Sequence, residues 1–368
     1  MSTDARTFKA IAARPAPRRE ASAFGWVRKN LLSTWHTSLG TVLVGLLVIR
    51  FLPSLLHWGF LDAVWQADYN ACHAASGACW GVVREKLRII LFGRYPFEEQ
   101  WRPLLATIFL LALLAASCLR SFWRTWLAPL WLVVLAIFFV TMRGGAFGLS
   151  PVETDRWGGL PLTLLLASLS MATAFPIGLL IAMGRCSAMP AIRSLCTIYV
   201  ELIRGVPLIS VLFMASFMLP LLMPQGMAID VLIRVYVGIA LFAAAYMAEV
   251  LRGGLQAVPR GQIEAAATLG LNYWQMQRKI VLPQALAMVV PGVINNFIST
   301  FKDTSLVTIV SLYELTGSMS LALNSDANWR PFKIEGYIFV AFIYFVFCFS
   351  MSQYSLWIER QLNKSRQR

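Results

Sequence analysis

The chain has 368 residues, of which 58% are hydrophobic and only 14% are charged. Soluble domains carry about 25% charged residues, and the apolar residues here fall in blocks of about 20, the length that crosses a bilayer as a helix. This composition excludes a soluble enzyme and a disordered scaffold. The formal net charge is +14, and its meaning depends on where the basic residues lie.

Eight apolar segments approach the length needed to cross about 30 Å of hydrocarbon. The third is short, and the seventh contains Asn295 and Asn296. We therefore expect an all-α polytopic membrane protein with eight transmembrane helices. In chain order the predicted spans are Leu39–Leu61, Trp101–Leu119, Trp126–Thr141, Leu160–Gly184, Leu202–Met223, Val231–Leu251, Pro283–Phe301 and Tyr337–Trp357.

Basic residues are concentrated in alternate connections between these spans. They occur in the tail of residues 1–38, at 120–124, 185–193 and 252–279, and in the C-terminal tail, whereas most acidic residues fall in the other connections. By the positive-inside rule, both termini are predicted to be cytoplasmic. The basic excess is thus an orientation signal, and no nucleic-acid partner is expected. Because 38 mostly polar residues precede the first span, we expect that span to remain as an anchor rather than to be a signal peptide.

Two of the six cysteines, Cys72 and Cys79, lie in the loop of residues 62–100, which is predicted to be external. Small residues between them, including Gly77, would let the chain close on itself. A short disulfide is one interpretation, and an exported loop permits it. Two unlinked thiols, or a metal site that includes His73, are the alternatives. No fourth metal ligand stands at a familiar spacing, so we predict no metal.

Motifs for catalysis are missing from the sequence. It contains no GxxxxGK[ST] phosphate loop, HExxH zinc helix, GxSxG elbow or CxxC pair. We therefore expect no catalytic residues and no cofactor in this chain. If it moves a solute uphill, the energy must come from an ion gradient or from a separate ATPase.

The longest internal cytoplasmic connection covers residues 252–282. Pro259 and Gly261 favour a turn, and Gln262–Leu269 is then predicted to be a helix, with Glu264 in its first turn favoured by the helix dipole. Gly270 is placed to end this helix. The connection is thus predicted to contain a turn, a helix and a stop.

A second short helix is predicted after the stop. Asn272 can cap it, and Pro283 can open the next span at a position where its missing N–H costs nothing. The first helix carries Ala265 and Ala266, whose small side chains suit an element that lies against another protein's groove. The alternative is an amphipathic helix on the membrane surface.

The sequence EAA at Glu264–Ala266, followed at fixed spacing by Gly270, Ile280, Leu282 and Pro283, resembles the coupling motif of ABC-importer permeases. RGVPLI at 204–209, NNFISTFKDTSLV at 295–307 and WGGLPLTL at 157–164 look like further signatures of the polar amino-acid branch of that family. Within the branch, the chain most resembles a permease subunit of the general L-amino-acid importers.

The resemblance implies a five-helix permease core at 157–362 with the coupling loop at 252–282. It is preceded by a three-helix extension at 39–145 with the external loop at 62–100, and the cytoplasmic tails are residues 1–38 and 363–368. The coupling helix would dock in a cytoplasmic ATPase that binds ATP and Mg. A non-identical sister permease and a periplasmic amino-acid-binding protein would complete an importer in the bacterial inner membrane. The residues assigned to coupling are Gly261, Glu264, Ala265, Ala266, Gly270, Leu282 and Pro283.

The densest polar cluster near membrane depth lies on the seventh span, where residues 295, 299 and 302 share a helix face. A free amino acid presents a carboxylate and an ammonium, and this cluster offers groups for both. The alternative is that the asparagines hydrogen-bond neighbouring helices and that Lys302 reaches the interface. The candidate pathway residues are Asn295, Asn296, Ser299, Lys302, Asp303, Thr304 and Ser305.

Three further features involve charged residues at or near membrane depth. Glu249 and Arg252 lie on neighbouring turns at the predicted cytoplasmic end of the sixth span and form a candidate gate, with interfacial structure as the alternative. Arg204 follows Glu201 by three residues, with the same ambiguity. Arg50, deep in the first span, is costly unless it is paired, and the sequence offers no partner for it.

The function predicted from the sequence is translocation of L-amino acids across the inner membrane as a subunit of an ATP-driven importer. An ion-gradient-driven secondary transporter is the alternative, but it would be expected to contain inverted repeats, and none is visible between the halves. A membrane enzyme would need clustered ionisable residues, whereas the three His residues are scattered.

Overall fold

The computed structural model describes residues 23–122, 125–224 and 229–366. Within these ranges the backbone is predominantly helical and contains no β-strand, and one isolated parallel bridge joins Gly159 and Glu314. The all-α prediction is confirmed. The chain divides into two compact units: a first unit of Met1–Val64 with Ala74–Ala78, and a second unit of Trp65–His73 with Cys79–Arg368.

From residue 23 on, the first unit contains one long helix. Its elements are α1 (Ala23–Asn30), α2 (Trp35–Leu56) and the π-helical turn η1 (His57–Leu61). Thr34 and Thr37 form a capping box that begins α2. Pro53 lies inside α2, and the N–H of His57 is shared between the carbonyls of Pro53 and Ser54 as the helix passes into η1. The apolar run Trp35–Leu61 has 27 residues, and none of its most apolar window is buried.

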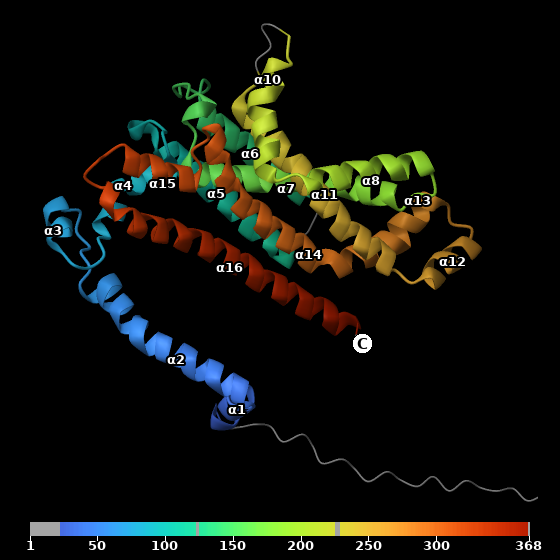
Figure 1. Cartoon of the computed structure of the whole chain (residues 1–368). Coiled ribbons are helices and arrows are strands. Elements are labelled where there is room, and N and C mark those ends of the chain that lie inside the picture. The colour runs from blue at the N-terminus through green and yellow to red at the C-terminus, as the bar shows by residue number, and fades with distance from the viewer. Residues whose placement is uncertain (1–22, 123–124, 225–228, 367–368) are drawn as a thin grey trace, which may run out of the picture. The chain divides into compact units, whose positions relative to one another are not determined.

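The second unit contains the other long helices (Figure 1). Short turns connect or extend these helices. The 3-10 turns are η2 (Phe97–Glu99), η3 (Arg120–Phe122), η4 (Thr154–Arg156), η7 (Thr304–Val310) and η8 (Arg330–Phe332), and the π-helical turns are η5 (Met214–Met218) and η6 (Gln277–Val281). The helices are α3 (Tyr69–Ala74), α4 (Gly81–Phe92), α5 (Trp101–Cys118), α6 (Leu127–Arg143), α7 (Gly159–Arg185), α8 (Pro190–Gly205), α9 (Leu208–Phe213), α10 (Leu219–Leu221), α11 (Val231–Ala257), α12 (Arg260–Thr268), α13 (Tyr273–Met276), α14 (Leu282–Asp303), α15 (Leu315–Asn324) and α16 (Lys333–Arg366).

The centre of the second unit is built from α7, α11 and α14, which pack closely against one another (Figure 1). Small residues allow this approach, as expected for helices packed inside a membrane. A Cβ atom at Gly178 of α7 would lie 3.0 Å from the carbonyl oxygen of Ala244 on α11, and one at Gly254 of α11 would lie 2.8 Å from that of Ala285 on α14. The three backbones are therefore held at distances that larger residues would not permit.

One end of this bundle, which we call the α4 end, is covered by α4 and α15. The two helices pack together, and the Lys86 ammonium lies 2.9 Å from Asp326, just beyond α15, where it holds the pKa of that carboxyl below its usual value. Gly159 begins α7 here with a φ of +64°, and a Cβ atom would collide with the carbonyl of Leu91. Only glycine fits this position without strain.

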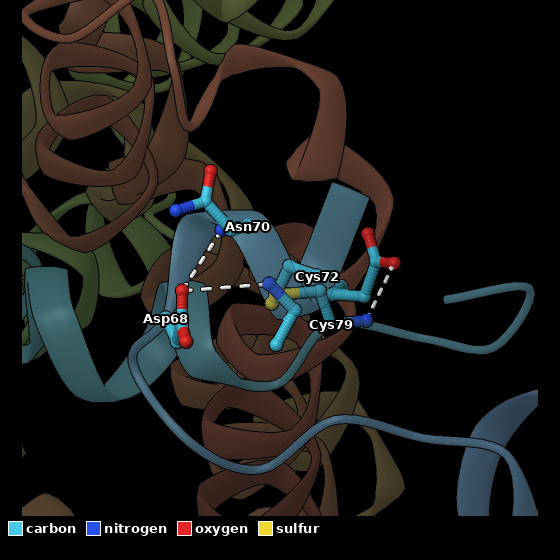
Figure 2. The surroundings of a disulfide bond; sticks show 6 residues. Asp68, Asn70, Cys72 and Cys79 are labelled. Atoms are coloured by element: carbon cyan, nitrogen blue, oxygen red, sulfur yellow. Dashed lines mark hydrogen bonds between the residues drawn. A yellow bond between two sulfur atoms is a disulfide. The ribbon is translucent and has the colours of Figure 1, made fainter. Parts of the chain in front are cut away.

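A disulfide closes the loop that precedes α4. Cys72 and Cys79 are bonded, with their Cα atoms 5.3 Å apart (Figure 2). Asp68 begins α3 by accepting a hydrogen bond from the backbone N–H of Asn70 at 2.9 Å. The Cys79 N–H donates to the Glu335 carboxylate of α16 at 3.1 Å. Because both sulfurs are in the disulfide, the alternative metal site with His73 is wrong.

The predicted count of eight spans is approximate. Within residues 23–122, 125–224 and 229–366, six helices are long and apolar enough to cross a membrane, or seven if the bent pair α8 with α9–α10 counts as one. The remaining candidate is α6, whose 17 residues would extend only about 26 Å. Each predicted span therefore corresponds to helical structure, but the fifth is broken and the third is short.

The predicted bounds of the fifth span, Leu202–Met223, are wrong. The helix α8 begins at Pro190, and a bend of 101° separates it from Leu208–Leu221. Val206 is extended, with φ −109° and ψ 135°, because the residue before a proline is disfavoured in the α conformation. Pro207 then caps the next helix.

The seventh span is longer than predicted, although α14 does begin at Leu282 with Pro283 in its first turn. The segment Tyr273–Val310 continues through α13, η6, α14 and η7 without an irregular loop. The π turn at Gln277–Val281 ends two residues before Pro283 and joins α13 to α14.

Candidate functional site

A cavity of about 700 Å³ opens among α8, α9, α11, α14 and η7 in the second unit. One face of α14 supplies its polar groups, since residues three or four apart share a helix side. The opposite wall comes from α11 and is largely aromatic and aliphatic. The lining residues are Arg204, Leu208, Phe242, Ala243, Tyr246, Glu249, Val250, Gly292, Asn295, Asn296, Ser299, Thr300, Asp303 and Leu306.

The α14 face presents a carboxylate, amides and hydroxyls in sequence along the helix. Asn295 and Ser299 are exposed to the cavity, whereas Thr300 is buried and directs its hydroxyl toward the Met171 sulfur at 3.5 Å. The Nδ2 atom of Asn296 is buried and has no hydrogen-bond partner among the described residues. Buried polar groups are normally satisfied, so this amide is free to donate to a bound molecule.

Four of the seven candidate pathway residues line this cavity, namely Asn295, Asn296, Ser299 and Asp303. The other three do not. Lys302 is exposed on another side of α14, and the buried hydroxyl of Thr304 donates to the Phe301 carbonyl at 2.7 Å. Ser305 is half-buried in η7 and absent from the lining.

The candidate gate pair is part of a larger ionic cluster. Glu249 accepts from Arg252 at 2.9 Å and from Arg185 of α7, and Arg204 of α8 lies 3.9 Å away. Arg185 also pairs with Glu201 at 3.1 Å. Three arginines and two carboxylates therefore join α7, α8 and α11 at the end of the bundle opposite α4.

The pairing of Arg204 differs from what its spacing suggested. It lies near Glu249 rather than pairing with Glu201, and its guanidinium stacks 5.3 Å from the Tyr246 ring centre. Of the cluster, Arg204 and Glu249 reach the cavity, whereas Arg252 does not. The cluster thus contributes two charged groups, Arg204 and Glu249, to the cavity lining.

The coupling loop forms a helix, a stop and a second helix. The helix α12 covers Arg260–Thr268, and Gly270 ends it with a φ of +74°. Asn272 caps α13 through a capping box with Gln275. Ala266 is buried against the chain, whereas Glu264 and Ala265 face outward. The assigned residues Gly261 and Gly270 are also exposed, and Leu282 and Pro283 lie at the start of α14.

Sequence reasoning missed two parts of these surfaces. Leu269 at the end of α12 is 77% exposed, and Trp274 in α13 is 68% exposed. In the cavity, Phe242 and Tyr246 were not singled out. Phe242 lies four residues before Tyr246, and Tyr246 lies three residues before Glu249. These spacings put all three side chains on one face of the helix, which is the signal that could have identified the two aromatic residues.

Comparison with known proteins identifies the family. Residues 174–364 match the family described as binding-protein-dependent transport system inner membrane component. This chain belongs to that family. The chain is therefore a multi-pass inner-membrane permease of the ABC class from a bacterium, and the prediction of a non-catalytic permease subunit is confirmed.

Two relatives of this permease match over nearly its whole length. The inner membrane amino-acid ABC transporter permease protein YhdY of Escherichia coli is 46% identical over 359 residues, which cover 96% of each chain. The glutamate/glutamine/aspartate/asparagine transport system permease protein BztC of Rhodobacter capsulatus is 36% identical and covers 96% of this chain and 97% of its own.

A solved structure is similar over a shorter stretch of the permease. It is described as the crystal structure of an amino acid ABC transporter with histidines and is 32% identical, with a TM-score of 0.50. The match covers 55% of this chain and 92% of that one. The two long relatives therefore match this chain including its N-terminal extension. The solved protein matches little more than half of this chain.

Proposed function

We propose that this permease is the translocation-pathway subunit of an ATP-driven importer of L-amino acids. The observation that carries the proposal is the cavity on α14, whose lining combines polar groups of α14, aromatic residues of α11 and the charged Glu249 and Arg204. Its volume of about 700 Å³ lies within the roughly 300–1,000 Å³ of small-molecule sites. The two long relatives are both named as amino-acid permeases.

The groups in the cavity match the constant part of an amino acid. The Asp303 carboxylate attracts the α-ammonium, and the unpaired amide of Asn296 donates to the α-carboxylate. Phe242 and Tyr246 offer apolar surface to the variable side chain without a specific polar contact. Such a pathway grips the backbone groups of many amino acids and discriminates weakly among their side chains.

Coupling to ATP hydrolysis takes place at α12. The outward-facing Glu264, the small Ala265 and the exposed Leu269 form the surface that enters a groove of the ATPase, while Ala266 and the following π turn hold α12 to α14. Movement of α12 is thus passed directly to the helix that lines the cavity. ATP and Mg bind to the ATPase and not to this chain.

Three kinds of partner complete the importer: cytoplasmic ATPase subunits, a periplasmic amino-acid-binding protein and a second, non-identical permease. The basic tail and the basic coupling loop set the orientation, with both termini in the cytoplasm. In this orientation the α4 end and its disulfide face the periplasm, which is an oxidising compartment.

Co-purification tests this proposal. The affinity-tagged chain, produced in its own cells and extracted in mild detergent, should bring down an ATPase and a second permease. In liposomes this complex should hydrolyse ATP faster when a binding protein loaded with an amino acid is added. A complex that lacks an ATPase but accumulates amino acids under an ion gradient would instead establish the secondary-transporter alternative.

A further inference from the structure

Three charged side chains, Arg204, Glu249 and Asp303, line the cavity on α14. Two of them are acidic, so Arg204 is the single cation among the described residues of the lining. An amino acid in this cavity brings one carboxylate and one ammonium. The carboxylate loses water as it enters, and its burial is costly unless a cation compensates the charge. The amide of Asn296 supplies a hydrogen bond to the carboxylate but no charge.

Two other arginines already neutralise Glu249. Arg252 binds it as a fork, with Nε 3.0 Å from Oε1 and Nη2 2.9 Å from Oε2. Arg185 of α7 also donates to Oε1. Arg204 approaches Oε2 only to 3.9 Å, which is longer than a hydrogen bond. Glu249 therefore stays paired if the Arg204 guanidinium binds another carboxylate.

Tyr246 holds the Arg204 guanidinium at the cavity. The Cζ atom of Arg204 lies 5.3 Å from the centre of the Tyr246 ring, within the range of a cation–π contact, and both side chains belong to the lining. A guanidinium that stacks through its face keeps its N–H groups in its own plane, where they can bind a carboxylate in pairs. Arg204 thus offers both the charge and the donor geometry that a carboxylate requires.

Contacts of α8 with its neighbours fix the position of Arg204, which lies in the last turn of that helix. Earlier in α8, the Tyr199 hydroxyl donates to the Leu241 carbonyl of α11 at 2.6 Å, and Glu201 pairs with Arg185 of α7 at 3.1 Å. The helix that carries Arg204 is therefore attached to two other helices. A binding group on a fixed helix loses little freedom when its ligand arrives.

We propose that Arg204 binds the α-carboxylate of the transported amino acid, while Asp303 compensates the ammonium. This inference rests on the proposed function, which makes the cavity part of the pathway. It extends that function, because the permease itself then selects for a free carboxylate in addition to any selection by the binding protein. The class of substrate is a zwitterion, and amino-acid amides and plain amines are rejected.

Equilibrium dialysis of the purified complex, without binding protein and without ATP, tests the contact. Labelled common L-amino acids are screened one at a time, and the one that binds the unaltered complex most tightly serves as the probe. Arg204→Gln should weaken its binding about 10- to 100-fold, the size expected for a lost hydrogen bond to a charged group. Arg193→Gln is the matched control, because it removes an exposed cation of α8 that is not in the lining, and it should leave binding unchanged.

The α-carboxamide of the probe distinguishes a direct contact from an indirect effect of the substitution. It keeps the ammonium and the side chain but lacks the carboxylate charge, so the unaltered complex should bind it at least about tenfold more weakly than the acid. Arg204→Gln should weaken binding of the acid but leave binding of the carboxamide nearly unchanged. Equal weakening of both ligands would show that Arg204 is merely structural and would overturn the inference.

A second variant covers the case in which Arg204→Gln does not assemble. Arg204→Lys keeps the positive charge but loses the paired donors of the guanidinium. It should weaken binding of the acid by several-fold, about as far as a lost second hydrogen bond allows, and leave binding of the carboxamide unchanged. A lysine variant that weakens both ligands alike counts against the contact in the same way.

The outcomes separate this inference from the proposed function. If the unaltered chain recovers no ATPase and accumulates amino acids under an ion gradient, the proposed function itself is wrong. If the complex contains an ATPase and drives uptake with ATP, but Arg204→Gln binds the acid as tightly as the unaltered complex does, the function stands and the inference is overturned. A transporting complex that binds no amino acid, or binds acid and carboxamide equally, also overturns the inference.

Discussion

Gly270→Asp should uncouple the importer without unfolding this subunit. Gly270 has a φ of +74° at the end of α12, and a Cβ atom built on it would have no neighbour within 4 Å. The substitution therefore causes no clash inside the chain. Its local cost is the strain of a left-handed non-glycine residue, about 1 kcal/mol, which should leave a multi-helix bundle inserted.

The cost at the ATPase interface is larger. In the proposed complex the new carboxylate would be buried against the ATPase groove without a cation, which costs several kcal/mol. At about 1.4 kcal/mol per factor of ten, a loss of about 4 kcal/mol weakens assembly roughly a thousandfold. The cost at the interface is several times larger than the local strain. The variant should therefore reach the membrane at normal abundance but fail to assemble with the ATPase.

The assay compares three quantities in the same cells: abundance of the tagged chain in the membrane, ATPase recovered with it, and uptake of a labelled amino acid. Gly270→Asn is the matched control, because asparagine has the same bulk and tolerates positive φ but carries no charge. We expect Asp to abolish recovery and uptake at normal abundance, and Asn to lower both only moderately. Full uptake by the Asp variant with its ATPase bound would refute the docking role of α12.

Three further outcomes are expected. The purified chain alone should hydrolyse no ATP, and turnover that persists after removal of every other protein would contradict the assignment of ATP hydrolysis to a partner. An impermeant maleimide should label Cys72 and Cys79 in intact cells only after reduction, with a double Cys→Ser variant as the background control; labelling only in permeabilised cells would invert the topology. Asp303→Asn should lower uptake about 10- to 100-fold, since a charge-assisted hydrogen bond contributes about 1.5–3 kcal/mol, while ATPase recovery is unchanged. Ser305→Ala, outside the cavity lining, should transport normally, and equal loss in both variants would refute the assignment of Asp303 to the pathway.

Much of the fold was predictable because hydropathy and helix length are local properties. The sequence missed α8 as a helix because its charged residues, among them Arg193 and Glu201, resemble a loop when only apolar runs are sought. The 101° bend was missed for the opposite reason, since the apolar run continues across it. Pro207 was the available signal, because it restricts Val206 to an extended conformation.

The candidate site also has a part that could be predicted from local sequence and a part that could not. The density of polar residues indicated this part of α14, so Asn295 and Asp303 were found, whereas helical spacing put Lys302 on the same face as Asn295 and it does not line the cavity. The wall opposite depends on how α11 packs, and the third cation of the Glu249 cluster, Arg185, comes from α7, which is distant in sequence. Such contacts are set by the fold of the whole unit, and no window of sequence contains them.

The contacts at the α4 end impose an order on biosynthesis. The Cys79–Glu335 hydrogen bond joins residues 256 positions apart, and the Lys86–Asp326 pair spans 240. At roughly 5–20 residues per second, a ribosome needs about 10–50 s to make the second partner of the hydrogen bond after the first. During that interval Cys79 and Lys86 have been made, but their partners Glu335 and Asp326 have not. The extension must therefore remain in the membrane without these contacts until the last helix emerges.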